Sequence, residues 1–314
     1  IDLGFWPGGD RDGNPFVTTI ITLDVAERLR QSILRSYYGD VKRLKRRFTF
    51  DGVQEILAKV EKRLYKHVVR SYKKVNFSQK ILLSELEAAR EIVKTKHNSL
   101  FIEELNDFIN KVRIFGFHFA TLDIRQDSRV HHKAFTQIVD DLAADGDTTF
   151  PKNYHHLSED EQILILSLVK GNIDPKILSD EMSVKTIESI YALKTIQARN
   201  GERGANRYII SNNQSALNVM QTFAMLNLCG FENELPVDVI PLFETVDDLE
   251  NSSDVMRTLY SNQAYRYHLT KRKNKQTIML GFSDGTKDGG YLMANWGIFK
   301  AKEALTKISR EFDI

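Results

Sequence analysis

Charged side chains follow three apolar segments of the chain, at the point where each segment ends. Arg125 follows "FATLDI", and Glu244 follows "DVIPLF". Asp284 follows "IMLGFS", and Lys287 comes three residues later. If the three segments are parallel strands of one sheet, their carboxyl ends meet at one edge, with neighbouring strands about 4.8 Å apart. Residues that are far apart in the sequence can then share one ligand.

These four side chains are of the right types for phosphate or carboxylate chemistry with a divalent ion. Glu244 and Asp284 offer two hard oxygen ligands, few enough to leave positions on a Mg²⁺ or Mn²⁺ ion for water and substrate oxygens. Arg125 and Lys287 bring positive charge, which suits a phosphorylated or carboxylated substrate. We therefore predict that Glu244 and Asp284 bind the metal and that Arg125 and Lys287 bind substrate and act in catalysis.

Either carboxylate alone has a simpler explanation, because acidic residues are favoured at helix N-termini and each would precede a helix. Their joint occurrence with two cations favours a shared site. Gly289 and Gly290 precede the segment "YLMANWGIFKAKEAL", for which we predict a helix. Glycines at its start would let an anion approach the exposed backbone amides.

The segment "GGDRDGN" (residues 8–14) places Asp10, Asp12 and Asn14 at alternate positions, as in a calcium loop. An EF-hand would need glycine and later glutamate where this chain has Pro15 and Ile21, so the pattern does not predict that type of site. We expect the segment to shape the mouth of the site rather than to take part in catalysis.

Composition excludes several classes of function. The 314 residues include 44 basic and 42 acidic side chains, and this net charge of +2 gives no global attraction to nucleic acid or to a membrane. The basic run at 42–48 is interpreted as a solvated helical face. No apolar stretch approaches the ~20 residues that span a bilayer. The single cysteine, Cys229, excludes an internal disulfide and fits a reducing compartment.

Helices account for most of the predicted structure. Apolar residues recur at helical spacing over 53–69 and again over 100–112. Ser158 and Glu161 have the spacing of a capping box, which predicts a helix over 161–171. The region from about 150 to 205 shows only helical patterns and is interpreted as an insertion.

Short apolar segments alternate with these helices and predict parallel strands: 116–125, 206–211, 236–244 and 276–284, with a shorter candidate at 2–6. The pattern is typical of an α/β protein, either an open sheet or a (β/α)₈ barrel. The glycine motif of a dinucleotide-binding sheet is absent, and five strands cannot close a barrel. We therefore predict that residues 1–314 form part of a barrel with added helices. Because the first residue is isoleucine, we expect the chain to begin inside a longer protein.

Four motifs, taken together, resemble the middle portion of phosphoenolpyruvate carboxylase in the same order. They are "GGDRDGNP", "LDIRQDS", "PLFETVDDLENS" and "GFSDGTKDGG", the last followed by "NWGIFKAKEAL". The resemblance implies a (β/α)₈ barrel surrounded by helices, in a bacterial-type cytoplasmic enzyme that is usually a homotetramer. It implies that Glu244 and Asp284 hold Mg²⁺ or Mn²⁺, that Arg125 holds phosphoenolpyruvate, and that Lys287 lies near bicarbonate or the phosphate.

The resemblance also implies the reaction. Bicarbonate attacks the phosphorus of phosphoenolpyruvate and gives carboxyphosphate and the enolate of pyruvate, and the enolate then adds to the carbon dioxide released. The product, oxaloacetate, replenishes the tricarboxylic acid cycle. The family's catalytic-histidine segment, T-A-H-P-T-E, and its G-R-G-G-S loop have no counterpart here. We therefore expect this polypeptide alone to be inactive.

Two other functions remain open on the sequence. One is a different barrel enzyme acting on phosphoenolpyruvate or pyruvate, such as a phosphotransferase, which would be expected to carry a phosphorylated histidine segment or a nucleotide-binding glycine loop. The other is a non-catalytic helical assembly module that keeps the strands as scaffold. In that case Glu244 and Asp284 would point away from each other.

Overall fold

A computed structural model describes residues 3–14, 16–69, 77–231 and 235–314. Pro15 of the "GGDRDGNP" motif lies outside these ranges. The chain divides into two compact units. The first unit comprises Ile1–Pro7, Ile20–Leu122 and Lys194–Ala205, and the second comprises Gly8–Thr19, Asp123–Leu193 and Asn206–Ile314. None of the helices in the described ranges has the length and apolarity needed to cross a membrane.

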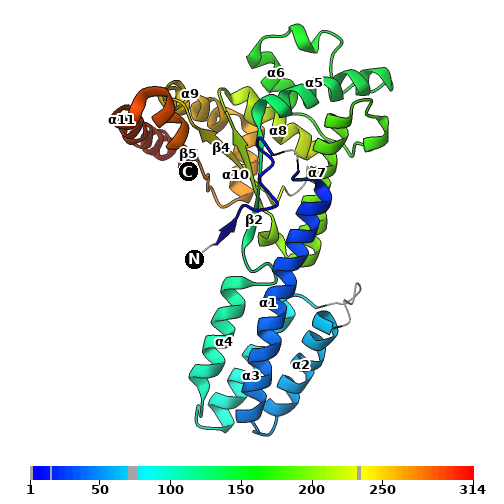
Figure 1. Ribbon diagram of the computed structural model, residues 1–314, viewed down its shortest axis with the longest axis vertical. Helices are drawn as coiled ribbons and strands as arrows, with labels where there is room; N and C mark the ends of the chain where they lie inside the picture. Colours follow the sequence, from blue (N-terminus) through cyan, green and yellow to red (C-terminus); the bar gives the residue numbers. More distant parts are fainter. Residues whose placement is uncertain (1–2, 15, 70–76, 232–234) are drawn as a thin grey trace. The chain divides into compact units, whose positions relative to one another are not determined.

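The first unit is built around four long helices, drawn in blue and cyan in Figure 1. They are α1 (Thr19–Arg47), α2 (Val53–Val69), α3 (Gln79–Lys96) and α4 (Ile102–Phe115). Each contributes a buried stripe to one continuous apolar cluster, which includes Tyr37, Leu57, Leu86 and Phe108. The cluster forms because apolar residues at three- and four-residue spacing fall on the same face of a helix.

The helical stripes predicted from the sequence are confirmed with one correction. Helix α2 has the predicted bounds, and its buried residues include Val53, Leu57 and Leu64. The second stripe begins later than expected, because Leu100 and Phe101 precede α4 and are largely exposed. Phe101 has a left-handed backbone with φ of 60°, which turns the chain before the helix starts.

The basic run at 42–48 lies at the end of α1, and some of its side chains form ion pairs with acidic residues of neighbouring helices. Lys45 pairs with Glu61 of α2, and Arg47 pairs with Glu104 of α4. These pairs support the interpretation of a solvated helical face, since Lys45 and Arg47 are already paired within the unit.

The strands run in the order β1-β2-β3-β4-β5, and every neighbouring pair is parallel. Within the first unit, β1 (Gly4–Phe5) pairs with the start of β2 (Thr121–Asp127). Within the second unit, the rest of β2 pairs with β3 (Arg207–Ser211), and β4 (Asp238–Phe243) lies between β3 and β5 (Met279–Leu280). Parallel strands, predicted from the apolar runs, are confirmed.

Two predicted strands differ from the structure in their bounds more than the others do. The run 116–125 becomes a strand only from Thr121, because Gly116 has a positive φ of 50° and ends helix α4. The run 276–284 contains only two strand residues, since α11 (Ser283–Glu311) already begins at Ser283. Gly290, with φ of 80° and ψ of 168°, interrupts that helix. The helix start expected at Gly289–Gly290 is therefore an internal kink.

Helices also dominate the second unit. They are α5 (Ser128–Ala144), α6 (Glu159–Leu166), most of α7 (Glu181–Asn200), α8 (Ala216–Leu228), α9 (Val246–Ser261), α10 (Gln263–Lys271) and α11. The predicted capping box of α6 is present, with Ser158 and Glu161 bonded reciprocally, although the helix ends at Leu166 rather than at 171. Two helices, α9 and α10, connect β4 to β5. Residues 150–205 contain no strand.

The side chains along the strands of the second unit change from charged to apolar and back to charged. Asp123 and Arg207 form an ion pair of 2.7 Å across β2 and β3. Further along, Ile209, Ile240 and Leu242 form a small buried cluster with Met279. Polar residues return after this apolar layer, at the carboxyl ends of the strands.

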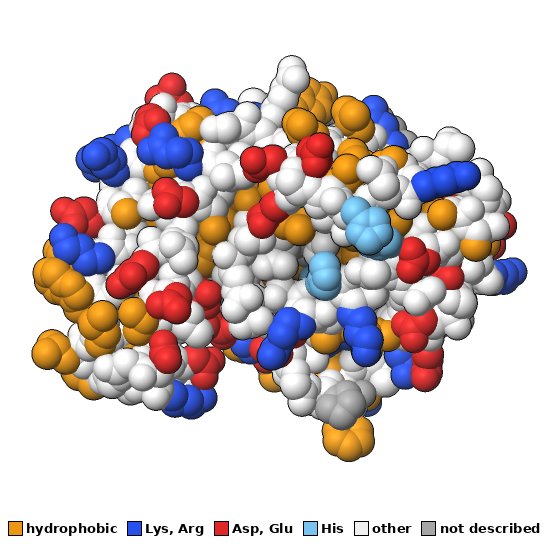
Figure 2. Space-filling model, turned by 90° about the horizontal axis from the view of Figure 1, so that it is seen from above, with side chains coloured by type: hydrophobic (Ala, Val, Ile, Leu, Met, Phe, Trp, Pro, Cys, Tyr) orange, Lys and Arg blue, Asp and Glu red, His pale blue; other side chains and the backbone are white. Residues whose placement is uncertain are grey.

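One face of the molecule carries interspersed acidic and basic side chains, in keeping with the balanced composition (Figure 2). Hydrophobic side chains gather at the edge where Figure 1 places α11. The exposed apolar residues of that helix are Tyr291, Leu292, Met293, Trp296 and Phe299.

Candidate functional site

Glu244 follows β4 directly, and its position is set by the start of the next helix. Thr245 is the N-cap of α9, and its side chain accepts a hydrogen bond from the Asp248 backbone N–H at 3.1 Å. The Asp248 carboxylate in turn accepts the backbone N–H groups of Glu244 and Thr245. This capping box holds the backbone of Glu244 in place, and the side chain is left to point toward β2 and β3.

The carboxylate of Glu244 is held from two sides. Its Oε2 accepts a hydrogen bond of 2.8 Å from the backbone N–H of Asn212, which follows β3. Its Oε1 lies 3.3 Å from Nη2 of Arg125 on β2. The ends of three neighbouring strands therefore converge on one carboxylate, as the parallel-sheet prediction requires.

Arg125 is the centre of the group, because three carboxylates surround its guanidinium. In addition to Glu244, Oδ2 of Asp10 lies 3.2 Å from Nη1, and Oδ2 of Asp12 lies 2.8 Å from Nη2. The backbone contributes as well, since Arg125 N donates to Gly9 O and Arg11 N donates to Arg125 O. The segment 8–14 thus runs beside the end of β2 and carries both aspartates to the arginine.

Asp284 and Lys287 form a second, more exposed pair in the first turn of α11. Lys287 Nζ lies 2.7 Å from Asp284 Oδ1, and three-quarters of the lysine side chain is exposed. The hydrogen bond and the charge of Asp284 raise the pKa of Lys287, and Glu244 adds to this effect. The ammonium group is therefore charged and lies within the electrostatic reach of both carboxylates.

Two glycines bring the start of α11 close to Glu244. A Cβ atom at Gly281 would lie 3.0 Å from Cγ and 3.2 Å from Cα of Glu244, and one at Gly285 would lie 3.2 Å from its carbonyl oxygen. Real Cβ atoms rarely approach other atoms so closely. The absence of side chains at 281 and 285 therefore lets the segment that carries Asp284 pack against the end of β4.

The pKa of Glu244 is raised, mainly because the carboxyl group is buried. The charges of Asp284 and Asp12 raise it further, while Asn212 and Arg125 act in the opposite direction. The neighbouring carboxylates therefore add to an effect whose main cause is burial, and a further cation beside Glu244 would oppose both.

Glu244 and Asp284 are donors of the type that a Mg²⁺-like ion takes, and they would be its carboxylate ligands. Magnesium usually keeps several waters and takes only one or two protein carboxylates. Among the described residues, no group of three or more His, Cys, Asp or Glu side chains is arranged to hold a metal on its own. Most of the coordination shell of an ion at this site would therefore come from water or from a bound anion.

Two features of the site were not assigned from the sequence. Asp10 and Asp12 were expected to shape its mouth, but they bind Arg125 directly. Their alternate spacing beside a strand end was the available signal. The backbone N–H of Asn212 could not have been found, because it depends on a left-handed residue after β3, with φ of 50°.

The fold and the site together define a class of protein. A parallel α/β sheet gathers carboxylates and cations at the carboxyl ends of its strands, the position at which α/β proteins bind charged ligands. Comparison with known proteins then gives the family. The family model described as phosphoenolpyruvate carboxylase matches residues 1–78 and 47–314, so the chain belongs to the phosphoenolpyruvate carboxylase family.

Two curated relatives are similar over almost the whole chain. Phosphoenolpyruvate carboxylase of Nitrosomonas eutropha is 30% identical over 98% of this chain, and that of Nitrosomonas europaea is 28% identical over the same share. In both cases the match covers 37% of the relative. The chain therefore spans little more than a third of the length of these proteins.

Proposed function

We propose that this chain supplies the metal-binding and anion-binding end of a phosphoenolpyruvate carboxylase, an enzyme that converts phosphoenolpyruvate and bicarbonate to oxaloacetate and phosphate. The observation that carries the proposal is the convergence of Arg125, Glu244, Asp12 and Asp284 from four separate segments of the chain. Membership of the family supports the choice of substrates. The rest of a (β/α)₈ barrel would come from parts of the longer protein.

Each side chain has a defined part in the proposed site. Arg125 and Lys287 bind the negatively charged oxygens of the two anionic reactants and offset the charge that they bring together. Asp10 and Asp12 orient the guanidinium of Arg125 before the anion arrives. Glu244 and Asp284 would hold Mg²⁺ or Mn²⁺. When bound, such an ion polarises phosphoryl oxygens and stabilises the negative charge of an enolate.

Manganese binding by this chain tests the proposal without requiring turnover. Isothermal titration calorimetry is carried out with Mn²⁺ on the unchanged chain and on a Glu244→Gln, Asp284→Asn double variant. The unchanged chain should bind Mn²⁺, and the double variant should lose binding by at least about tenfold, because carboxamides are poor ligands for hard cations.

A matched control separates the site from general charge effects. The variant Asp160→Asn, Glu188→Gln removes the same two charges from exposed positions of the second unit and should bind Mn²⁺ as the unchanged chain does. Equal affinity in all three proteins, or no binding by the unchanged chain, would contradict the proposed site.

The activity is proposed for the longer protein. The isolated chain has no counterpart of the family's catalytic-histidine segment or of its Gly-Arg-Gly-Gly-Ser loop. We therefore expect no steady-state formation of oxaloacetate from phosphoenolpyruvate, bicarbonate and Mg²⁺ by the purified chain. Measurable turnover would show that the residues described here suffice for the reaction.

A further inference from the structure

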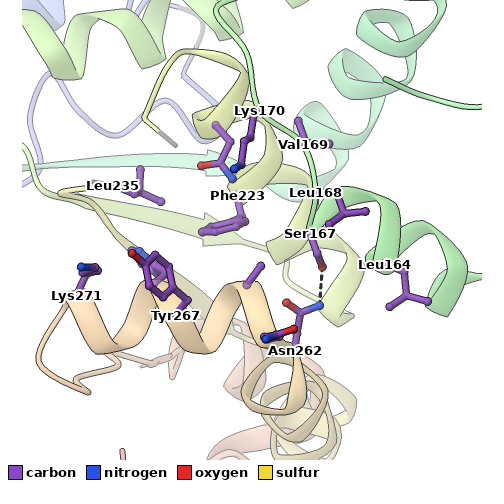
Figure 3. A pocket seen from close by; sticks show the side chains of 14 residues that line it. Leu164, Ser167, Leu168, Val169, Lys170, Phe223, Leu235, Asn262, Tyr267 and Lys271 are labelled. Atoms are coloured by element: carbon purple, nitrogen blue, oxygen red, sulfur yellow. Dashed lines mark hydrogen bonds between the residues drawn. The ribbon is translucent and has the colours of Figure 1, made fainter. Parts of the chain in front are cut away.

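A cavity of about 760 Å³ opens in the second unit, among the helices rather than at the strand ends (Figure 3). It is bordered by the end of α6 with the segment 167–170 that follows it, by α8, by Leu235 and by α10. Its volume falls within the ~300–1,000 Å³ typical of small-molecule sites. None of its lining residues belongs to the group around Arg125, so the cavity is separate from the proposed active site.

The cavity has an apolar floor and an apolar rim. Phe223 of α8 forms part of the floor, is only 5% exposed, and packs edge-to-face against Tyr265 at 5.8 Å between ring centroids. At the rim, Leu168 is 79% exposed and Tyr267 is 58% exposed. Large apolar side chains exposed beside a concavity are characteristic of a binding surface, and the aromatic rings favour a planar apolar ligand.

Among the described residues that line the cavity, the charged groups are all of one sign. Lys170 and Lys271 contribute to the lining, and none of its described residues is acidic. Burial lowers the pKa of His268, the remaining basic lining residue, to about 4, and Arg272 adds to this effect, so the imidazole is neutral near pH 7. The two lysines are therefore the cations that a ligand in this cavity would meet.

The two sides of the cavity are tied together by a hydrogen bond that Figure 3 shows as a dashed line. Asn262 Nδ2 donates to Ser167 Oγ at 2.6 Å, which links the segment after α6 to the start of α10. The same asparagine caps α10 by accepting the Tyr265 backbone N–H. Lys271 Nζ lies 5.2 Å from the centroid of the Tyr267 ring, so one cation and one aromatic rim residue are already paired. The cavity is thus largely formed before a ligand binds, which lowers the entropic cost of binding.

We propose that this cavity binds an aromatic carboxylate. The ring system lies against Phe223 and Tyr267, and the carboxylate is balanced by Lys170 and Lys271. The ligand is a single anion with an apolar body. A compact phosphate or dicarboxylate would bury no ring against the apolar floor, and a neutral apolar molecule would make no use of the lysines.

The probe for the test is 2-naphthoate, and its neutral analogue 2-naphthalenemethanol serves as the comparison ligand. Both are titrated into the chain and into a Lys170→Gln, Lys271→Gln double variant by isothermal titration calorimetry. The unchanged chain should bind 2-naphthoate saturably and more tightly than the alcohol. The double variant should bind 2-naphthoate about fivefold more weakly, with no change for the alcohol, because exposed charge pairs each contribute modestly.

A control variant carries the same change of charge elsewhere. Lys300 and Lys307 line a different cavity beside α11, and the Lys300→Gln, Lys307→Gln variant should bind 2-naphthoate as the unchanged chain does. A further variant, Leu168→Glu, introduces a negative charge at an exposed rim position, where no packing is lost, and should also weaken binding of 2-naphthoate.

Three results would overturn the proposal. The first is an absence of saturable binding of 2-naphthoate, and the second is equal affinity for the acid and the alcohol, which would identify a neutral apolar docking surface. The third is an equal loss of affinity in the two double-lysine variants. Manganese binding at Glu244 and Asp284 is measured on the same proteins and should be unaffected, so failure here is distinct from failure of the proposed active site.

Discussion

The two units of the chain use buried residues in different ways. In the first unit, apolar side chains from four helices form one continuous cluster. In the second unit, the buried cluster along the strands consists of Ile209, Ile240 and Leu242 with Met279 packed against it. It lies between an Asp123–Arg207 ion pair and the carboxylates around Arg125.

The difference between the two units indicates that the first contributes mainly to stability and that the second carries the groups that could bind ligands. A continuous apolar cluster is stabilising, and its residues need no specific partner beyond close packing. Buried charges are expensive and persist only when they are paired. The second unit also buries many apolar side chains, such as Phe135, Leu226 and Phe243, but it holds paired charged groups along its strands as well, as expected of a unit that binds ionic ligands.

The largest expected effect comes from truncating the core of the first unit. Leu57 is fully buried in α2, so Leu57→Ala should lower the free energy of unfolding by about 3 kcal/mol through lost contacts and a cavity. Urea unfolding followed by circular dichroism measures this effect. Lys62→Ala, at an exposed position of the same helix, should change stability by less than about 0.5 kcal/mol.

Loss of manganese binding in Leu57→Ala, under conditions in which the chain stays folded, would contradict this separation of stability and binding. In that case the core of the first unit would control the geometry of the site in the second. Unchanged Mn²⁺ affinity would support the separation of stability and binding.

Mild acid should destabilise the second unit more than the first. His131 is fully buried between the Tyr208 hydroxyl (2.9 Å) and the Thr222 hydroxyl (3.0 Å), and burial lowers its pKa to about 3, with Asp127 opposing and Arg11 assisting. In the unfolded chain the pKa is about 6.5. As the pH falls below 6.5, His131 binds a proton in the unfolded state but stays neutral in the folded state. The free energy of unfolding therefore falls.

At pH 5, His131 alone lowers the free energy of unfolding by up to about 2 kcal/mol. His268, whose pKa is lowered to about 4, acts in the same direction in the second unit. In the first unit, burial lowers the pKa of His67 as well. Proton NMR of the eight histidines provides the test: between pH 7 and pH 5 the His131 imidazole signals should stay in place, and those of His268 should move by only about a tenth of a full titration shift. Titration of both near pH 6.5 would contradict the prediction.

The smallest expected effect concerns the cap of a short helix. Helix α6 has only eight residues and exposes Leu164, so it depends on its capping box more than the 17-residue helix α2 depends on either end. Ser158→Ala should cost about 1 kcal/mol in urea unfolding. Ser158→Thr preserves the hydroxyl and should restore most of that loss. If both variants lost the same free energy of unfolding, the hydroxyl group at position 158 would not be what stabilises the helix.

Much of the site could be predicted from the sequence, because parallel strands impose a simple rule. Once the apolar runs are interpreted as parallel strands, Arg125 and Glu244 must lie at the same edge of the sheet, and the structure places them 3.3 Å apart. The same rule brings the segment after β1, with Asp10 and Asp12, to this edge, because β1 is parallel to β2. What the rule does not give is the direct pairing of both aspartates with Arg125.

Element boundaries were harder to predict than the elements themselves. The apolar run before Asp284 suggested a long strand, but Ser283 and Asp284 already belong to the first turn of α11. Apolar content alone could not distinguish the two, because both a short strand and the packed start of a helix bury such residues. The beginning of β2 was misplaced for a similar reason, since "GFHFA" is apolar but forms the turn after α4.

The three carboxylates around Arg125 determine how an anion can bind there. The guanidinium is already paired with Asp10, Asp12 and Glu244, so an incoming anion exchanges one partner for another rather than adding a new one. Because the number of close charge pairs stays nearly constant, salt should weaken anion binding less at this site than at a solvated arginine. If Arg125 binds an anion as proposed, that anion would take the place of a carboxylate, and ligands whose charge exceeds that of a single carboxylate would be favoured.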